Sequence, residues 1–170
     1  MQTKILRGMR KLIIKTFLRE PRGKTMLIEI LQSAENNNVV DIDTQAMMEG
    51  ALMVSEMQVR DIMLPSSEIT SITLTDDVKN IHQTMARSGH SRFPAFDETG
   101  ENVLGILLAK DLLASELTDG KNKIRGMLRV PVFVPESKKL NILLREFKAN
   151  RNHLAVVVDE YGKVSGLVSI

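Results

Sequence analysis

The chain has 170 residues, of which 43% are hydrophobic and 26% are charged, a composition typical of globular domains. It contains no cysteine, which excludes disulfides, thiol nucleophiles and thiolate metal sites and fits a reducing cytoplasm. No stretch approaches the roughly 18 consecutive apolar residues of a membrane-spanning helix, so we expect a soluble protein of one compact domain or two small ones.

The net charge of +2 conceals an asymmetry along the chain. Residues 1–24 hold eight basic side chains against the single acidic Glu20, whereas residues 25–170 are net acidic. This basic leader carries apolar side chains at helical spacing, namely Leu6, Met9, Ile13 and Phe17. A basic amphipathic helix suits an anionic membrane surface or nucleic acid. The alternative is a solvated tail whose apolar stripe packs on the body of the protein or on a partner subunit.

Residues 25–57 are expected to form a helical lead-in. Apolar periodicity predicts a short helix over 24–35, which the three asparagines at 36–38 end. Asp43 or Thr44 is expected to cap a second helix that runs to Met57. We expect the many methionines here to fill a core and not to bind a metal. The buried sides predicted for the two helices are Leu27, Ile28 and Leu31 on the first, and Met47, Ala51 and Val54 or Met48 and Leu52 on the second.

The rest of the sequence repeats itself. Asp97, Glu98 and Gly100 recur 62 positions later as Asp159, Glu160 and Gly162, and Gly105 recurs 61 positions later as Gly166. Self-similarity at a fixed period reveals the structural unit, which here has about sixty residues and occurs twice. We therefore expect a tandem pair, and small-molecule sites often form where paired units meet.

Each copy is predicted to contain a strand, a helix, a hairpin and a closing helix. In the first copy the strand spans 69–74, the hairpin strands span 92–97 and 103–108, and the closing helix begins at Lys110. Thr75 is expected to cap the first helix, which Gly89 ends. The apolar face of that helix is predicted from spacing to be Val78, Ile81 and Met85.

The second copy predicts the same order. Ser137 replaces Thr75 as the cap, and the hairpin strands span 155–158 and 164–170. The apolar helix face becomes Leu140, Leu143 and Phe147. The sequence stops at Ile170, inside the last strand, so we expect a second copy that is C-terminally truncated and lacks its closing helix.

Four motifs together resemble a known family. They are Val59-Arg-Asp-Ile-Met-Leu-Pro65, Gly89-His-Ser-Arg-Phe-Pro-Ala-Phe-Asp97, Gly105-Ile-Leu-Leu-Ala-Lys-Asp111 and Gly166-Leu-Val-Ser169. Over about residues 45–170 the chain looks like a CBS (cystathionine-β-synthase) domain pair, and more narrowly like that of the CorC/HlyC family of magnesium and cobalt efflux proteins. The resemblance implies an α/β (α+β) fold in which each CBS unit is a small sheet with two helices. The domains expected are the leader at 1–24, the helical lead-in at 25–57, CBS domain 1 at 58–118 and CBS domain 2 at 122–170.

The resemblance further implies a regulatory module that binds AMP or ATP, with or without Mg²⁺, in the cleft between the units. The residues that match the family's nucleotide pocket are Leu64, Pro65, His90, Ser91, Arg92, Phe93 and Ser169. A second, pseudo-symmetric site would use Asp111, Val130, Pro131, His153 and Leu154. The residue types suit this chemistry, because an arginine fork matches phosphate oxygens, hydroxyls match ribose, and Leu and Pro offer an apolar slot for adenine.

Several of these residues have simpler interpretations. Arg92 could form a surface ion pair with Asp97 or Glu98 instead of binding phosphate, and Asp111 could serve only as a first-turn cap. His90 is expected to pack or hydrogen-bond, not to catalyse. The paired acidic residues Asp97, Glu98, Asp159 and Glu160 are expected in hairpin turns.

Nothing in the sequence predicts catalysis or a metal site. The histidines His82, His90 and His153 lack metal-ligand spacing, and we find no phosphate-binding loop and no nucleophile with an evident base. We therefore expect no enzyme.

The family resemblance implies a homodimer that forms through the CBS discs. Other partners expected are a membrane transporter or, through the basic leader, a membrane surface, which gives a location in the cytoplasm or at the periphery of the inner membrane. Nucleic acid is disfavoured, because the body is acidic and its single Tyr and absent Trp leave no stacking platform. The alternatives are a stand-alone cytosolic stress or ribosome-associated CBS protein and a ligand-free dimerisation module.

Overall fold

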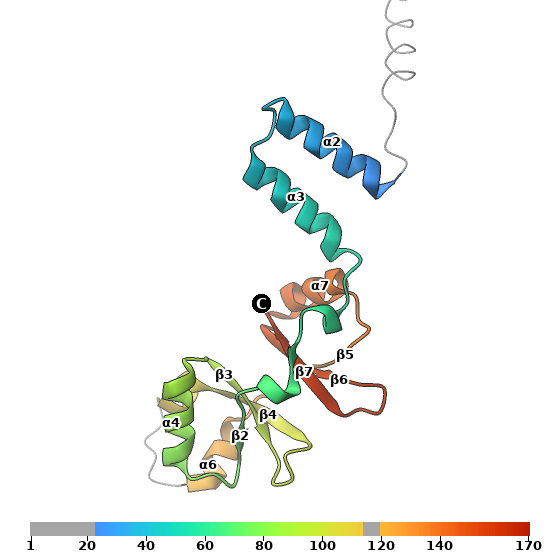
Figure 1. Ribbon diagram of the computed structural model, residues 1–170. Coiled ribbons are helices and arrows are strands. Elements are labelled where there is room, and N and C mark those ends of the chain that lie inside the picture. The colour runs from blue at the N-terminus through green and yellow to red at the C-terminus, as the bar shows by residue number, and fades with distance from the viewer. Residues whose placement is uncertain (1–22, 114–119) are drawn as a thin grey trace, which may run out of the picture. The chain divides into compact units, whose positions relative to one another are not determined.

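The computed structural model describes residues 23–113 and 120–170. The chain divides after Val54 into two compact units, which are described separately (Figure 1). The basic leader expected at 1–24 lies, except for its last two residues, outside the described residues. The same holds for the closing helix beyond residue 113.

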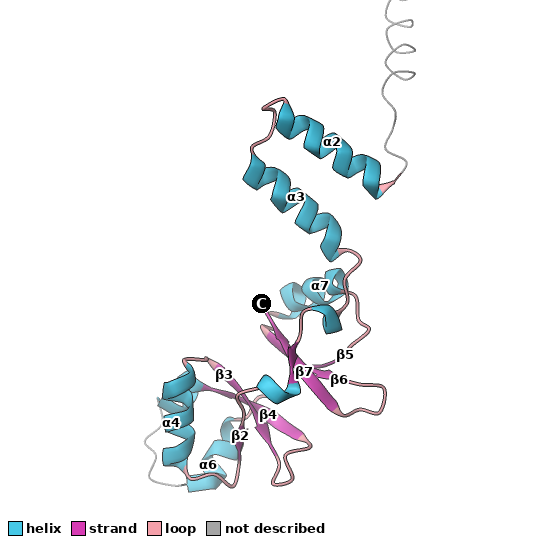
Figure 2. Ribbon diagram, viewed as in Figure 1, coloured by secondary structure: helices cyan, strands magenta, loops and turns pink. Residues whose placement is uncertain are grey.

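The first unit is a pair of helices that contact each other, α2 (Lys24–Asn36) and α3 (Ile42–Val54) (Figure 2). The first of these was predicted correctly, but the cap predicted for the second is wrong. Asp41 precedes α3, and its carboxylate accepts hydrogen bonds from the backbone N–H of Thr44 at 2.8 Å and from the Thr44 hydroxyl at 2.7 Å. These bonds lower the pKa of Asp41. An N-cap aspartate reaches the N–H three residues on, so the helix begins at Ile42.

The described methionines of this unit do not fill a core. No residue of the described part of this unit is buried, and the side chains of Met47 and Met53 are 74% and 55% exposed. The expectation of buried faces was therefore wrong for this segment. Two short helices form a layer too thin to enclose a side chain without a further element packed on them.

The second unit contains two small sheets. The three-stranded sheet has the order β2 (Ile72–Thr73), β3 (Arg92–Phe96), β4 (Val103–Leu108). Its helices are α4 (Val78–Ser88), α5 (Ala109–Leu113) and α6 (Gly120–Met127). The four-stranded sheet has the order β1 (Leu64–Pro65), β7 (Val164–Ser169), β6 (Leu154–Val158), β5 (Phe133–Pro135), with helix α7 (Leu140–Asn150). Both sheets combine one parallel pair with antiparallel pairs, which confirms the predicted mixed α/β tandem fold.

The main helices of the two copies bury the faces that spacing predicts. Ile81 and Met85 of α4 lie in the core of the first copy, and Leu140, Leu143 and Phe147 of α7 are buried in the second. Gly89 ends α4 in the left-handed conformation at φ 68°, as expected.

The predicted caps of both main helices are wrong. Asp77 and Lys139 stand at the N-cap positions in place of Thr75 and Ser137. The carboxylate of Asp76 instead accepts a hydrogen bond from the backbone N–H of Thr73 at 3.0 Å. A local turn of this kind precedes the helix and delays its first residue.

Each copy completes the sheet of the other. Strand β1 belongs to the first copy in sequence but pairs with β7 of the second copy, with Leu64 opposite Leu167. In return, Arg129 of the second copy exchanges two backbone hydrogen bonds of 2.9 and 3.0 Å with Ile106 of β4. The domain boundaries remain predictions. These backbone pairings, however, join residues on the two sides of the predicted boundary between the copies.

The repeated glycines lie where these exchanged segments cross. A Cβ atom on Gly166 would approach the Leu64 carbonyl oxygen to 2.5 Å, and one on Gly105 would approach the Leu128 Cβ to 2.6 Å. Real Cβ atoms do not come so close, so both positions require glycine for the crossing segment to fit. A small cluster of Ile106, Val156 and Leu167 then joins the two sheets, and we call this junction the seam.

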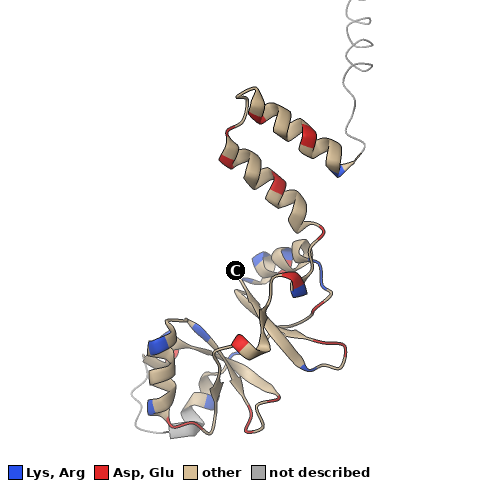
Figure 3. Ribbon diagram, viewed as in Figure 1, with Lys and Arg blue, Asp and Glu red and all other residues tan. Residues whose placement is uncertain are grey.

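The repeated aspartates organise the two hairpin turns, as the sequence predicts. Asp97 accepts hydrogen bonds from the Thr99 hydroxyl at 2.8 Å and the Asn102 side-chain amide at 2.7 Å. Asp159 accepts hydrogen bonds from the backbone N–H groups of Tyr161 and Lys163 at 3.0 and 2.8 Å. Figure 3 shows the acidic residues at both hairpin tips.

Acid is expected to destabilise the second unit partly through Asp97. The hydrogen bonds from Asn102 and Thr99 hold the pKa of Asp97 well below its usual value of 3.8. The stabilisation is therefore complete above the unfolded-state pKa and is lost as the pH falls through the folded-state pKa. Asp97→Asn should lower the free energy of unfolding at neutral pH and flatten its decline below about pH 4. Urea denaturation across this range checks the result, with Glu98→Gln as the control that should retain the wild-type slope.

Candidate functional site

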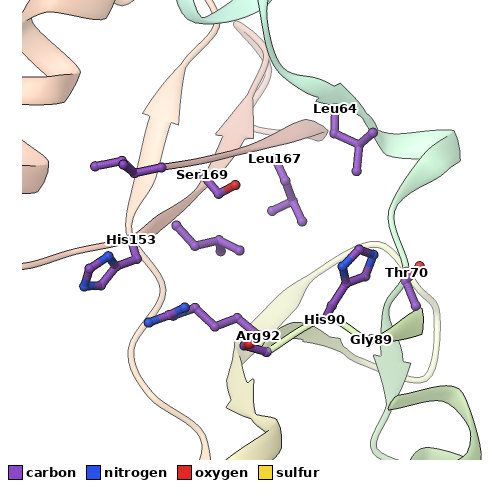
Figure 4. A pocket seen from close by; sticks show the side chains of 11 residues that line it. Leu64, Thr70, Gly89, His90, Arg92, His153, Leu167 and Ser169 are labelled. Carbon is purple, nitrogen blue, oxygen red and sulfur yellow. The ribbon is translucent and has the colours of Figure 1, made fainter. Parts of the chain in front are cut away.

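A pocket of about 340 Å³ lies beside the seam and draws its lining from both copies (Figure 4). Its lining residues are Leu64, Thr70, Gly89, His90, Ser91, Arg92, His153, Leu154, Leu167, Ser169 and Ile170. The residues before β3 and before β6 face each other here, because the two copies are arranged in a similar way around the seam. The volume falls within the range of small-molecule sites.

The charged and ionisable side chains that line this pocket are all basic. Arg92 opens β3, His90 precedes it, and His153 stands just before β6. Figure 4 shows these three side chains along one side of the pocket, with Leu64, Leu167 and Ser169 on the other. A pocket with three basic side chains and no acidic side chain in its lining favours an anionic ligand.

Arg92 is half-buried, and no hydrogen bond or ion pair with another described residue engages its guanidinium group. The surface ion pair with Asp97 is not formed, because that carboxylate is bonded within its own turn. A guanidinium group offers five N–H donors in a planar fork. In this position the fork is free to bind the oxygens of a phosphate or carboxylate.

The remaining lining combines apolar and hydroxyl groups. Leu64 and Leu167 are paired across β1 and β7, so the exchanged strand supplies one apolar wall. Thr70, Ser91 and Ser169 add hydroxyl groups. Such a wall can receive a flat apolar ring, while the hydroxyls can bond polar substituents.

Five of the residues predicted for the first site meet in this pocket: Leu64, His90, Ser91, Arg92 and Ser169. Pro65 is not part of the lining, and Phe93 has no exposed surface. Alternation along β3 directs Phe93 into the core on the opposite side from Arg92. Its ring nevertheless lies 6.3 Å from that of His90 at a tilt of 54°, so His90 packs as predicted.

The residues predicted for the second site are divided. His153 and Leu154 line the pocket just described. Asp111 instead forms an ion pair with Arg129, in which Nη2 and Oδ2 are 3.0 Å apart. Asp111 also stands in the first turn of α5, as the capping interpretation predicts, while Val130 is 90% exposed.

Sequence reasoning missed Thr70, Gly89, Leu167 and Ile170. Leu167 reaches the pocket through its pairing with Leu64, which no local pattern predicts. Thr70 precedes β2 and could have been found from the alternation of residues 69–74.

The described residues give little support for a metal site or for a membrane-spanning helix. No group of three or more metal-ligating side chains occurs in residues 23–113 and 120–170. No helix in this part of the chain is long and apolar enough to cross a bilayer.

Comparison with known proteins gives two family matches. The CBS domain model matches residues 59–117 and 121–170, and a model described as the N-terminal region of NMB0537 matches residues 19–54. Among curated proteins, the magnesium and cobalt efflux protein CorC of Vibrio cholerae is 42% identical over 158 residues, which cover 91% of this chain and 53% of that protein. The chain thus spans about half the length of the curated relatives it matches.

Solved structures are similar over most of the chain. A conserved domain of unknown function from Neisseria meningitidis is 40% identical with a TM-score of 0.76, covering 84% of this chain and 93% of that one. The CBS domain of a bacterial CNNM/CorC family Mg²⁺ transporter in complex with ATP is 29% identical with a TM-score of 0.68, covering 75% and 91%. A CBS-domain pair with bound AMP from Klebsiella pneumoniae is 31% identical with a TM-score of 0.60, covering 67% and 92%.

Proposed function

Because the chain belongs to the CBS-domain family, as a pair of the kind found in CorC magnesium and cobalt efflux proteins, we propose that it regulates such a protein by binding an adenine nucleotide. The nucleotide occupies the pocket beside the seam. The proposal includes no catalytic step: the ligand is bound and released unchanged.

The observation that carries the proposal is the basic character of this pocket. Arg92, His90 and His153 converge on it from two copies, and no acidic side chain lines it. Phosphate is the part of a nucleotide that such a cluster binds, with the Arg92 fork as the main donor. The leucine wall opposite, which includes Leu64 and Leu167, receives the adenine ring. Structures with ATP and AMP among the similar proteins support this choice of ligand.

Regulation follows from the position of the pocket between the copies. A ligand that touches β3 of the first copy and β6 of the second favours the arrangement of the two that fits it best. Its effect is limited to the difference between its affinities for the two arrangements. The transport protein with which the module is associated responds to that change. The module acts as a homodimer at the cytoplasmic side of the membrane.

Calorimetric titration of the chain with AMP, ADP and ATP, each with and without Mg²⁺, tests the proposal. We expect saturable binding. Because the ionisable side chains of the pocket are basic, the affinity should rise with the number of phosphates and fall as the salt concentration rises. Absence of heat from all three nucleotides at millimolar concentration would leave a ligand-free dimerisation module as the better description. Light scattering on the same samples tests the homodimer.

A further inference from the structure

We propose that the basic leader folds back on the helix pair of the same chain and covers the outward face of α3. That face is apolar and exposed, and the helix pair is opposite in charge to the leader. The occupant of the face is thus a segment of this chain and not a membrane surface or a second copy. The inference concerns the first unit alone and is independent of nucleotide binding.

The outward face of α3 has the composition of a buried surface. This helix lies wholly within the described residues, and Asp43 is the one polar residue among the eight that it exposes. The large apolar side chains among them include Ile42, which is 67% exposed, together with Met47 and Met53. A helix that is apolar on all sides is normally buried. We therefore expect a further element to cover this face.

The less exposed side of α3 is the more polar one. Thr44, Gln45 and Glu49 are half-buried, and the side-chain amide of Gln45 donates a hydrogen bond of 2.7 Å to Glu49. A helix pair that stood alone would be expected to turn such groups to water and its methionines inward. The reversed arrangement indicates that α3 is the middle element of a larger bundle, with α2 on one side and the missing element on the other.

The charge of the helix pair selects the leader as that element. Residues 25–54 contain five acidic side chains and no basic one, whereas the leader has eight basic side chains against Glu20. The five are Glu29, Glu35, Asp41, Asp43 and Glu49. A second copy of α3 would bring another acidic helix pair against the first, and an anionic lipid surface would be repelled in the same way. The leader neutralises this charge.

The length and direction of the leader also fit. Its apolar stripe advances 11 positions from Leu6 to Phe17, and the face of α3 advances 11 positions from Ile42 to Met53, which is about 16 Å of helix in each case. Figure 1 shows α2 and α3 running in opposite directions, as their five-residue connection predicts. The proline and glycine at 21–23 allow a second reversal just before α2. The leader then runs parallel to α3, with Phe17 beside Met53.

Engineered cysteine pairs test this placement, because the chain has no cysteine of its own. Phe17→Cys combined with Met53→Cys should form a disulfide within one chain on mild oxidation, since such a bond requires Cα atoms within about 7 Å. Leu6→Cys combined with Met53→Cys is the matched control. It should remain reduced, because about 16 Å of helix separates these positions in the parallel alignment. Non-reducing electrophoresis and mass spectrometry measure the yields.

Oxidation of methionine by peroxide gives a second measurement on a chain without cysteine. The leader should shield Met53, and Ile13→Asp, which places a charge in the apolar stripe of the leader, should speed the oxidation of Met53 about tenfold. Met48 lies on a different side of α3 and is 41% exposed. It is the internal control and should oxidise at the same rate in both chains, as read by tandem mass spectrometry.

The other occupants of the face give different outcomes. Equal yields from the two cysteine pairs, or equal Met53 oxidation in the wild type and Ile13→Asp, would show that the leader has no fixed place on α3. Disulfides between chains would assign the face to a second copy. Loss of the first disulfide on addition of vesicles that contain phosphatidylserine would assign the leader to a lipid surface. Each of these results would overturn the inference and leave the proposed function untouched.

Discussion

Arg92→Ala is expected to weaken ATP binding by about 10- to 150-fold, because it removes the main phosphate donor of the pocket. Hydrogen bonds to charged groups contribute roughly 1.5–3 kcal/mol, which corresponds to this range of dissociation constants. The guanidinium group forms no hydrogen bond or ion pair with another described residue that the alanine would also remove. The thermal stability of the ligand-free chain should therefore change little. Calorimetric titration of both chains gives the ratio directly.

Two variants sharpen this prediction. Arg145→Ala removes an exposed arginine of α7 and should leave the affinity for ATP unchanged, which excludes a general effect of net charge. Arg92→Lys should recover only part of the affinity, since an ammonium group keeps the charge but loses the planar fork. Equal affinities in the wild type and Arg92→Ala would refute the placement of phosphate at Arg92.

Gly166→Ala is expected to lower the free energy of unfolding of the second unit by about 2–3 kcal/mol. The new methyl carbon would stand 2.5 Å from the Leu64 carbonyl oxygen and 3.0 Å from the Met63 sulfur. The first of these is a backbone atom that belongs to the β1–β7 pair, so it cannot turn aside as a side chain could. Strand β1 must therefore move away from β7. Denaturation with urea measures the loss.

The same substitution should also impair the pocket, because Leu64 moves with β1. Gly105→Ala forms the matched comparison: its methyl carbon would meet Leu128 at 2.6 Å, so it should destabilise the unit similarly but leave Leu64 in place. Gly126→Ala is the control, since open space surrounds that position in α6. Alanine should make the helix slightly more stable there. A wild-type free energy of unfolding in Gly166→Ala would contradict the close contact between β1 and β7.

Much of the second unit could be predicted from sequence because its repeat is local and periodic. The hairpin strands, the buried faces of α4 and α7 and the turn roles of Asp97 and Asp159 all follow from spacing. Two of the predicted helix caps failed because a neighbouring aspartate forms a different local turn: Asp41 bonds the Thr44 N–H and α3 begins earlier than predicted, while Asp76 bonds the Thr73 N–H ahead of α4.

The pocket was predicted less completely, for a different physical reason. Arg92, His90 and Ser91 are neighbours in sequence and were found together. Their meeting with His153 depends on contacts between residues some sixty positions apart, and no local pattern encodes the pairing of Leu64 with Leu167. Phe93 was predicted from the family resemblance, but alternation along a strand sends it to the face opposite Arg92.

The exchange of β1 and the Leu128–Arg129 segment between the copies limits how the two copies can be separated in evolution. A single copy cut out with its own sequence would carry an edge that fits its neighbour and lack the edge that fits itself. Shuffling one copy into another protein would leave two sheets with unpaired backbone groups. The two copies are therefore inherited, and diverge, as a pair.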